Sequence, residues 1–465
     1  MWPTSKGKPP IFGVRGDSAS AHLPVEGSFP SWLKGSLVAN GPAVFESGKW
    51  KAKHFSDGLA RVQRLDVEGG DISYLARLLD TQALSDALGA GESSKPGFAT
   101  PAKRSFWGRV RDSFVPPVAD NANASVVPTK YGLLALGETS APVEVDRKRL
   151  SARGPRPFPE ADLEAVHPIL EPDGVLLGLS TRLREPAGHV LWRTGADGRS
   201  RRVLARLPSA FPSYVHSFSV TPRHAVLVEP PLVLDPTGPR SRPLRERMTW
   251  QPSRGTRFVV LGRADGRVRA TGHGAPFFVL HHVQAFERGT DVFVDVVAHE
   301  DAGVLDAIST GTVGSGQAGG LAGRVWRCTI PAAGGFVESH RLSDEPVEFP
   351  VAHPAQPGHA AQFVYGLGSD LKRSQGSLDQ IVKIDLADGK TVRWRRAGAW
   401  PGPPSFVPRP GARREDDGVV LTLVFDGDRG ESSLVALDAA TLQEIAHAQL
   451  PEPSPVPSHA CWVGG

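Results

Sequence analysis

Short apolar runs separated by turn residues recur along the whole chain. Examples are YGLLALGE, HVLWRT, HAVLVE, TRFVVLGR, DVFVDVVAH, QIVKIDL and GVVLTLVF. Asp-Gly pairs follow or precede many of these runs, and Asp-Gly is a favoured dipeptide of tight hairpin turns; the pairs lie at 173–174, 197–198, 265–266, 388–389 and 417–418. A strand about every ten residues favours a sandwich, a barrel or a propeller.

The number of expected strands favours a propeller among these three architectures. A sandwich rarely needs so many strands, whereas a propeller uses four in each blade. No repeat as clear as a WD signature marks individual blades, so the pattern alone does not decide between the architectures.

Two segments depart from the β pattern. The stretch 81–114 has helical periodicity, with Phe106, Val110 and Phe114 four residues apart among lysines and arginines between 103 and 111. It predicts a short basic amphipathic element, which either caps the barrel with its charges in solvent or contacts a membrane surface. The proline-broken segment 230–250 predicts a long excursion between strands, either a lid or an entrance loop.

Composition narrows the class of protein. With 465 residues, 40% of them hydrophobic and 22% charged, the chain is typical of a soluble globular protein with a sizeable core. A net charge of +4 gives nucleic-acid binding little support. The two cysteines, Cys328 and Cys461, predict no disulfide framework and a reduced, cytoplasmic setting. The first thirty residues lack an apolar core segment, so we expect no signal peptide. Because no apolar run reaches about eighteen residues, we expect no membrane-spanning helix.

Four histidines that stand at or beside predicted strands are spread over the second two thirds of the chain. They are His167 in EAVHPIL, His216 in PSYVHSFSV, His281 in FFVLHHVQAFE and His459 in PSHACWV. Their wide spacing excludes a zinc finger or a metal motif carried by one helix. Although a single histidine in a strand is more often a core or surface residue, the inner strands of a closed propeller would bring all four to one axis. If they converge, neutral imidazoles suit a redox-active first-row metal such as iron.

Motifs spread along the chain carry a resemblance to a known family. Near the N-terminus they are Trp32-Leu33-Lys34-Gly35, Asn40-Gly41-Pro42 and the string HFSDG at 54–58. LLALGET, VHPILEPDG, YVHSFSVTPRHAVLVEPP, FFVLHHVQAFERG, VEFPVAH, EDDGVVL and SHACW follow in the same order. Taken together, these strings make the chain similar to the carotenoid cleavage oxygenases over almost its full length.

The resemblance implies an all-β, seven-bladed propeller with a helical and loop cap over the face that carries the active site. It implies one domain over 1–465, closed by the N- and C-terminal segments, with cap elements at about 81–118 and 230–250. An Fe(II) ion is expected on the axis, held by His167, His216, His281 and His459.

The tandem histidines at 281 and 282 require a choice. The family places its ligand three positions before the Asn of an Asn-Ala-Tyr-Glu string, which here reads Gln284-Ala285-Phe286-Glu287. This position selects His281. Alternation along a strand also allows only one of two adjacent side chains to face the axis.

The family orients its metal-bound histidines with three glutamates. By motif, Glu138 is expected to hold His216 and Glu348 to hold His281, which fixes the tautomer and the direction of each ring. Pro403 occupies the place of the third glutamate, so His459 lacks its expected carboxylate. Either water or a carbonyl group substitutes for it, or the local alignment slips, or the affinity for iron is reduced.

The implied reaction is cleavage of a C=C bond by O2 into two carbonyl products, with no general base or nucleophile from the protein. Stilbenoid-cleaving relatives have a lysine where this chain has Gly137, and many members have a threonine where it has Ala124. Both differences favour an apolar carotenoid or apocarotenoid. Ala124, Phe218, Phe277 and Phe278 are expected to line a substrate tunnel.

The sequence therefore leaves three functions open. The first is an Fe(II) carotenoid or apocarotenoid dioxygenase. The second is stilbenoid cleavage or retinoid isomerisation on the same scaffold, and the third is a propeller that binds a polyene or lipid without turnover. For the first we expect a cytoplasmic monomer that contacts the membrane surface to reach its substrate, with O2 as co-substrate.

Overall fold

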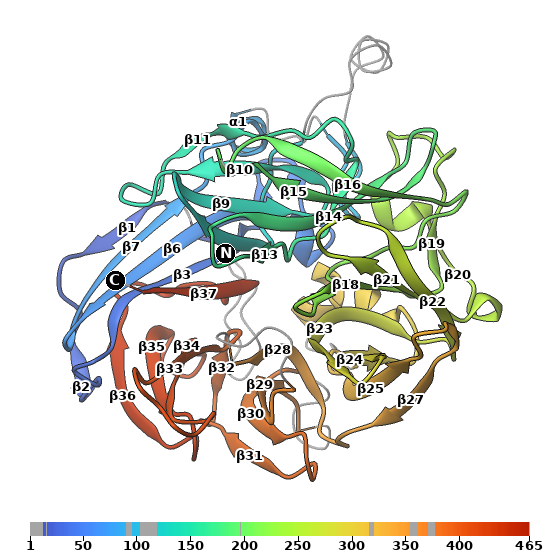
Figure 1. Ribbon diagram of the computed structural model, residues 1–465. Helices are drawn as coiled ribbons and strands as arrows, with labels where there is room; N and C mark the ends of the chain where they lie inside the picture. Colours follow the sequence, from blue (N-terminus) through green and yellow to red (C-terminus); the bar gives the residue numbers. More distant parts are fainter. Residues whose placement is uncertain are drawn as a thin grey trace.

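Seven sheets of four to six strands surround one axis in the computed structural model (Figure 1). The structure describes residues 13–14, 16–89, 95–102, 119–195, 197–315, 320–353, 360–370 and 377–464. Each sheet is one blade, and we number the blades 1 to 7 along the chain. The predicted seven-bladed β-propeller is confirmed.

The first four blades contain the following strands, in sheet order. Blade 1 has β1 (Ser18–Ser20), β7 (Asp71–Leu78), β6 (Leu59–Glu68), β3 (Lys34–Val44) and β37 (His459–Gly464). Blade 2 has β11 (Ala152–Pro155), β10 (Ser140–Val145), β9 (Gly132–Gly137) and β8 (Ser125–Thr129). Blade 3 has β12 (Leu163–Glu164), β14 (Leu176–Arg182), β15 (Gly188–Thr194) and β16 (Arg201–Pro208), with β13 (Ile169–Leu170) beside β14. Blade 4 has β17 (Ser219–Val220), β18 (His224–Glu229), β21 (Thr256–Gly262), β22 (Val268–Gly274) and β26 (Gly335–Phe336).

The remaining three blades continue around the ring. Blade 5 has β23 (Phe278–Arg288), β24 (Asp291–His299), β25 (Arg324–Ile330) and β27 (Glu338–Arg341). Blade 6 has β28 (Val347–Ala352), β29 (Phe363–Gly368), β30 (Gln380–Asp385) and β31 (Thr391–Trp394). Blade 7 has β2 (Val25–Gly27), β36 (Glu444–Gln449), β35 (Glu431–Asp438), β34 (Gly418–Asp426) and β32 (Ala399–Pro401), with β33 (Ser405–Pro408) beside β34.

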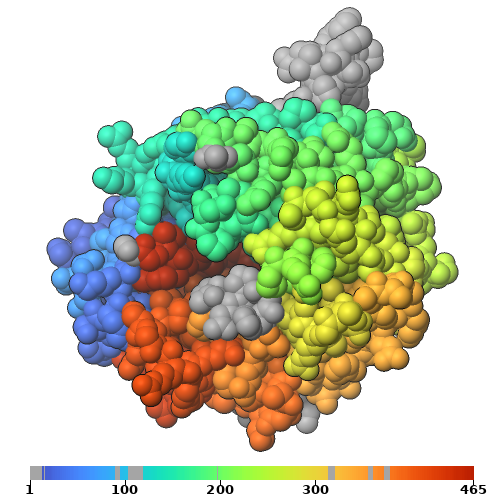
Figure 2. Space-filling model, viewed as in Figure 1, coloured from blue at the N-terminus to red at the C-terminus, as the bar shows by residue number. Residues whose placement is uncertain are grey.

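Strands from both ends of the chain close the ring. The C-terminal strand β37 pairs with β3 of blade 1, in a register that places His459 opposite Asn40. The early strand β2 pairs in turn with β36 of blade 7. The N-terminal segment thus adds a strand to the last blade, and the C-terminal segment adds a strand to the first. Figure 2 shows the red C-terminal residues directly beside the blue N-terminal blade. The expected closure by terminal segments is therefore a direct strand exchange.

The core consists of apolar layers between neighbouring blades. Strand β18 illustrates the arrangement, because Ala225 and Leu227 pack toward blade 3 whereas Val226 and Val228 pack toward blade 5. Both faces of such a strand are buried, so its sequence reads as a continuous apolar run rather than an alternating one. Similar clusters occupy the other blade boundaries, including that between blades 7 and 1.

Short elements lie outside the seven blade sheets. They are the hairpins β4 (Glu46–Ser47) with β5 (Trp50–Lys51) and β19 (Leu232–Leu234) with β20 (Met248–Trp250), the α-helices α1 (Gln82–Gly89), α3 (Gly303–Ala307) and α4 (Thr310–Ser315), and the 3-10 helices η1 (Phe55–Asp57), η2 (Leu244–Arg247) and η3 (Pro252–Arg254). The segment expected as a long excursion at 230–250 is thus a hairpin, and its leucines pack in one apolar cluster with Phe98, Tyr214 and Phe278. A role of this hairpin as a lid or entrance stays a prediction.

Helix α1 lies within the stretch 81–114, for which we expected helical structure. The basic amphipathic part of that stretch, including Phe106, Val110 and Phe114, lies outside the described residues. In the part of the chain that the structure describes, no helix is long and apolar enough to cross a membrane.

Replacement of Gly41 by alanine should weaken the ring closure. A Cβ atom at Gly41 would lie 2.5 Å from the Ser458 nitrogen and 2.7 Å from the Pro457 Cα, both of which are backbone atoms that lead into β37. We expect the free energy of unfolding to fall by about 1–3 kcal/mol, the usual cost of overpacking. Urea unfolding measures this change. Gly89→Ala is the matched control because, among the described residues, no atom outside its own helix and chain neighbours lies within 4 Å of its added Cβ; equal losses in both variants would contradict the prediction.

Candidate metal centre

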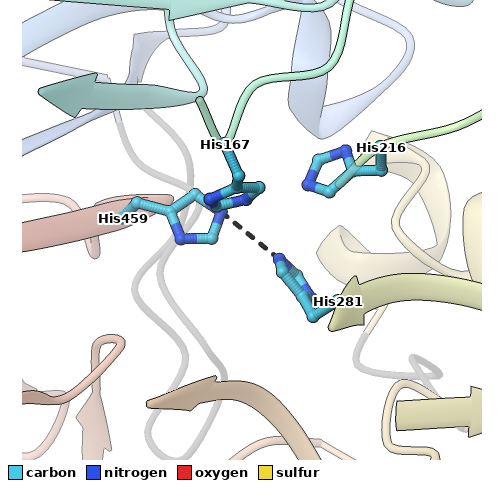
Figure 3. Close-up of side chains that lie close together, drawn as sticks. All are labelled: His167, His216, His281 and His459. Atoms are coloured by element: carbon cyan, nitrogen blue, oxygen red, sulfur yellow. Dashed lines mark hydrogen bonds between the residues drawn. The ribbon is translucent and has the colours of Figure 1, made fainter. Parts of the chain in front are cut away.

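Segments of blades 1, 3, 4 and 5 bring the four histidines together (Figure 3). His167 lies between β12 and β13, where the inner strand of blade 3 is interrupted. His216 precedes β17, and His459 is the first residue of β37. His281 lies in β23, where the pairing with β24 shifts register between Val279 and His282. The convergence that a closed architecture would allow is therefore present.

Backbone and hydroxyl contacts hold these segments side by side. The Ser217 hydroxyl donates to the Leu280 carbonyl at 2.7 Å and accepts the His282 N–H at 3.1 Å. The Val166 N–H donates to the His216 carbonyl at 3.1 Å. Each histidine on blades 3 to 5 is therefore next to a residue that is bonded to the neighbouring blade.

A similar set of contacts holds the segment before His459. The Ser458 N–H donates to the Asn40 carbonyl at 3.0 Å, and its hydroxyl donates to the Asn123 carbonyl at 3.3 Å. The fully buried Asn40 amide donates to the carbonyls of Ala122 and Ser125, at 2.8 Å each. The Asn-Gly-Pro motif thus connects blade 2 to the closing strand.

The four rings face a common point. One nitrogen from each of His167, His216, His281 and His459 lies within 4.8 Å of the others. The ring centroid of His167 lies 4.3 Å from that of His459 and 5.1 Å from that of His216, at steep interplanar angles of 85° and 60°. Rings in this arrangement point their nitrogens inward rather than stacking on each other.

Within the part of the chain that the structure describes, the inward nitrogens have no protein partner that would satisfy them. The Nε2 atoms of His167 and His216 are buried without a hydrogen bond. The Nε2 atoms of His281 and His459 lie 3.4 Å apart, a weak contact in which only one of the two can donate. Unpaired buried polar atoms are costly. A cation at the common point would satisfy all four lone pairs, so the donor set fits a metal ion.

Two buried carboxylates bind the outer nitrogens of two rings. Glu138, in the turn between β9 and β10, lies 2.5 Å from the Nδ1 atom of His216. Glu348 of β28 lies 2.5 Å from the Nδ1 atom of His281. With Nδ1 as donor to a carboxylate, Nε2 of each ring carries the lone pair that points to the centre. These are the two pairings that the motifs led us to expect.

Burial and hydrogen bonds shift the pKa values of three of the four histidines and of both carboxylates. Burial, followed by the neighbouring histidines, lowers the pKa of His167 and of His459 well below 6.5. Burial also lowers the pKa of His281, although Glu348 opposes this. Burial alone would raise the pKa values of Glu138 and Glu348, but hydrogen bonds and charges from their histidine partners hold both below the usual value. Neutral imidazoles are the form that binds a metal.

His459 differs from His216 and His281. Among the described residues, no carboxylate forms an ion pair with its ring, and Pro403, in the segment where the resemblance led us to expect a third glutamate, is buried. The Phe349 ring packs against it instead, with centroids 5.2 Å apart, and also contacts His281 at 4.9 Å. Apolar packing therefore supports this corner of the centre.

The second histidine of the tandem pair faces a different environment. The His282 Nδ1 lies 2.8 Å from the Ser219 hydroxyl, and burial lowers the pKa of His282 to about 3. Its nitrogens are not among the four that converge. The alternation of the strand thus separates the two neighbours, as expected.

The residues expected to line a tunnel have varied surroundings. Phe218 and Phe277 are buried in the apolar layers between blades, and Phe278 is fully buried in the cap cluster. Ala124 is partly exposed. Their role as tunnel lining stays a prediction.

Three residues beside the centre had no place in the sequence-based site. Phe349 adopts a left-handed backbone with φ of 52°, and its N–H donates to Glu348 at 2.8 Å. Tyr214 donates to Glu138, and His299 contacts Glu348. The position of Tyr214 two residues before His216 is a usable signal, since both then face one side of an extended segment. For His299, only the register between β23 and β24 shows the proximity.

Comparison with known proteins shows which family the chain resembles. The model of the retinal pigment epithelial membrane protein family matches residues 13–464. Carotenoid cleavage dioxygenase 8 homolog A of Oryza sativa subsp. japonica is 29% identical over 483 residues, covering 97% of this chain and 86% of that protein. Apocarotenoid-15,15'-oxygenase of Synechocystis is 28% identical over 457 residues, covering 94% and 92%.

A solved structure extends the similarity to three dimensions. The cobalt-substituted Synechocystis apocarotenoid oxygenase aligns with a TM-score of 0.82 at 25% identity, covering 100% of this chain and 98% of that one. Because the family match, the relatives and the fold agree over nearly the whole chain, the protein belongs to the carotenoid cleavage oxygenase family, the family of the retinal pigment epithelial membrane protein.

Proposed function

We propose that the protein is a non-haem Fe(II) dioxygenase that uses O2 to cleave one C=C bond of a carotenoid or apocarotenoid into two carbonyl products. The observation that carries this proposal is the cluster of four imidazole nitrogens within 4.8 Å of one another. The names of the relatives, which include carotenoid cleavage dioxygenases and an apocarotenoid oxygenase, support the substrate class.

The donor set supports iron over alternative ions. Four neutral nitrogens suit a divalent first-row metal, whereas Ca²⁺ and Mg²⁺ require oxygen ligands. No cysteine belongs to the cluster, so a thiolate site is absent from the described residues. Ferrous iron held there would supply the one-electron chemistry toward O2 that organic side chains lack.

The protein groups hold the ligands rather than transfer protons. Glu138 and Glu348 fix the direction of His216 and His281, and each carries a negative charge beside the centre. Those two charges balance the double charge of a bound Fe(II) in a buried site. Addition of both atoms of O2 across a C=C bond gives two carbonyl groups without a protonated intermediate, so the reaction needs no general base.

The surroundings of Gly137 support an apolar substrate over a phenolic one. A Cβ atom there would lie 2.5 Å from the Ser140 hydroxyl and 2.7 Å from the Asn121 carbonyl. A lysine at this position, which would bind a phenol in the stilbenoid-cleaving relatives, therefore has no room. The cytoplasmic location, the monomeric state and the contact with a membrane surface stay predictions.

Turnover of polyenes tests the proposal directly. The purified chain, loaded with Fe(II) and offered apocarotenoids of several lengths, should consume one O2 for each C=C bond cleaved and release aldehydes, detected by mass spectrometry. His216→Ala is the control and should abolish the product. Iron-loaded wild-type protein that consumes no O2 and releases no aldehyde with any polyene would refute the enzyme and favour a binding protein.

The tandem histidines provide a matched pair of variants. His281→Ala removes a ring that points at the centre, so we expect loss of bound iron beyond the roughly 100-fold that a lost supporting group can cost. His282→Ala makes the same change one residue along the strand, where the ring contacts Ser219 instead. Iron content by metal analysis should fall only in the first variant. The reverse result would show that the assignment of the pair is wrong.

The metal-free chain should lose stability as the pH falls below about 6.5. In the folded state the pKa values of His167 and His459 lie well below this value, because both rings are buried. Below pH 6.5 the unfolded chain therefore binds more protons than the folded one, and the free energy of unfolding falls by about 1.4 kcal/mol per pH unit for each such histidine. Glu138 and Glu348, whose pKa values are also lowered, add a loss of the same sign only below about 4.5.

Urea unfolding with a chelator, between about pH 7 and pH 5, measures this slope. His459→Leu removes one of these buried groups and should flatten the dependence in part, because His167 remains and burial also lowers the pKa values of His281 and His282. A slope that this replacement leaves unchanged would contradict the assignment to the buried imidazoles.

A further inference from the structure

Each of the two carboxylates beside the centre has a second protein partner. The His299 Nε2 lies 2.7 Å from Oε1 of Glu348, whereas Oε2 of the same carboxylate binds His281 and the Phe349 N–H. The Tyr214 hydroxyl donates to Oε1 of Glu138 at 2.5 Å, the same oxygen that binds His216. All of these side chains except Phe349 are less than a tenth exposed.

The two partners are linked through one fully buried ring. Phe278 lies between Tyr214 and His299, with ring centroids 6.2 Å and 6.3 Å away respectively. It stacks on Tyr214 with an interplanar angle of 14°. Phe278 is also paired directly with His299 in the register of β23 and β24. Phe278, which was expected to line a tunnel, thus lies between the side chains of Tyr214 and His299.

A second donor changes what the carboxylate can do. A glutamate that accepts one N–H from an imidazole can still turn about its terminal torsion, which is broad in energy. Glu348 has donors on both oxygens, so the plane of its carboxylate is fixed. Glu138 receives two donors on Oε1, and its Oε2 is buried with no partner among the described residues, so Tyr214 is the group that opposes its rotation.

We propose that Tyr214 and His299, held apart by Phe278, are positioning residues that fix Glu138 and Glu348 and thereby the direction of the His216 and His281 rings. The two residues are not ligands, and they act through the carboxylates. The inference rests on the proposed metal-binding function of the four histidines and names the residues that hold two of their carboxylate partners in place.

Cobalt(II) binding to the full chain tests the inference without reliance on turnover. The Kd for Co(II) and the visible absorption of the bound ion report the affinity and the geometry of the ligands. His299→Leu keeps an apolar side chain but removes the donor, and we expect a Kd increase of about tenfold or more with an altered spectrum. His299→Gln restores an N–H at a similar place and should return both values close to those of the wild type. Tyr214→Phe should raise the Kd by about threefold to tenfold and shift the spectrum.

Two matched controls separate positioning from general stability. His189, 1% exposed, makes a similar buried contact with Glu229 in blades 3 and 4 at 3.2 Å. Tyr365, also 1% exposed, donates its hydroxyl to the Ala439 carbonyl at 2.9 Å. His189→Leu and Tyr365→Phe should lower the melting temperature without changing Co(II) affinity or the spectrum.

The outcomes distinguish a failure of the positioning role from a failure of the proposed metal-binding function. If the wild type binds Co(II) but His299→Leu and Tyr214→Phe bind it equally well with unchanged spectra, the positioning role is refuted. If His299→Gln is as impaired as His299→Leu, the role of the donor is refuted as well. If His299→Leu does not fold, the Tyr214→Phe result decides. A wild-type chain that binds no Co(II) would overturn the proposed function itself.

Discussion

Closure of the ring is the constraint on which the candidate site depends. His459 lies on β37, the strand that completes blade 1 from the far end of the chain, opposite Asn40. Asn40 in turn binds two carbonyls of blade 2. The fourth imidazole therefore reaches the axis only when the first and last parts of the chain have paired. Any cation bound by all four rings would stabilise the closed ring, because the open chain offers no such site.

The sequence was sufficient for the features that depend on periodicity and on motif order. Buried strands such as β18 read as apolar runs because both of their faces pack against neighbouring blades. The turn pairs placed many of the boundaries, and the ordered motifs supplied the number of blades. The choice of His281 over its neighbour followed from one local string, and the two rings do face different surroundings.

The contacts that surround the histidine ligands, such as that of His299 with Glu348, could not be predicted from periodicity or motif order. They depend on strand register and on the local backbone conformation. His299 reaches Glu348 because a bulge in β23 shifts the pairing that places it opposite Phe278. Phe349 packs on two of the histidines through a left-handed backbone that few residues other than glycine adopt. The segment 230–250 was expected as an excursion, but its hairpin pairing depends on the cap cluster that it completes.

The missing third glutamate changes the charge beside the centre. Two buried carboxylates would balance the charge of one divalent cation, whereas the three that the family resemblance led us to expect would add one more negative charge. Where the family's third carboxylate would lie, this chain has a proline, and the Phe349 ring packs on His459. Packing can restrict the ring without adding charge, although it cannot polarise the imidazole as a carboxylate does. Apolar packing thus restricts the His459 ring, whereas contacts with buried carboxylates orient the His216 and His281 rings.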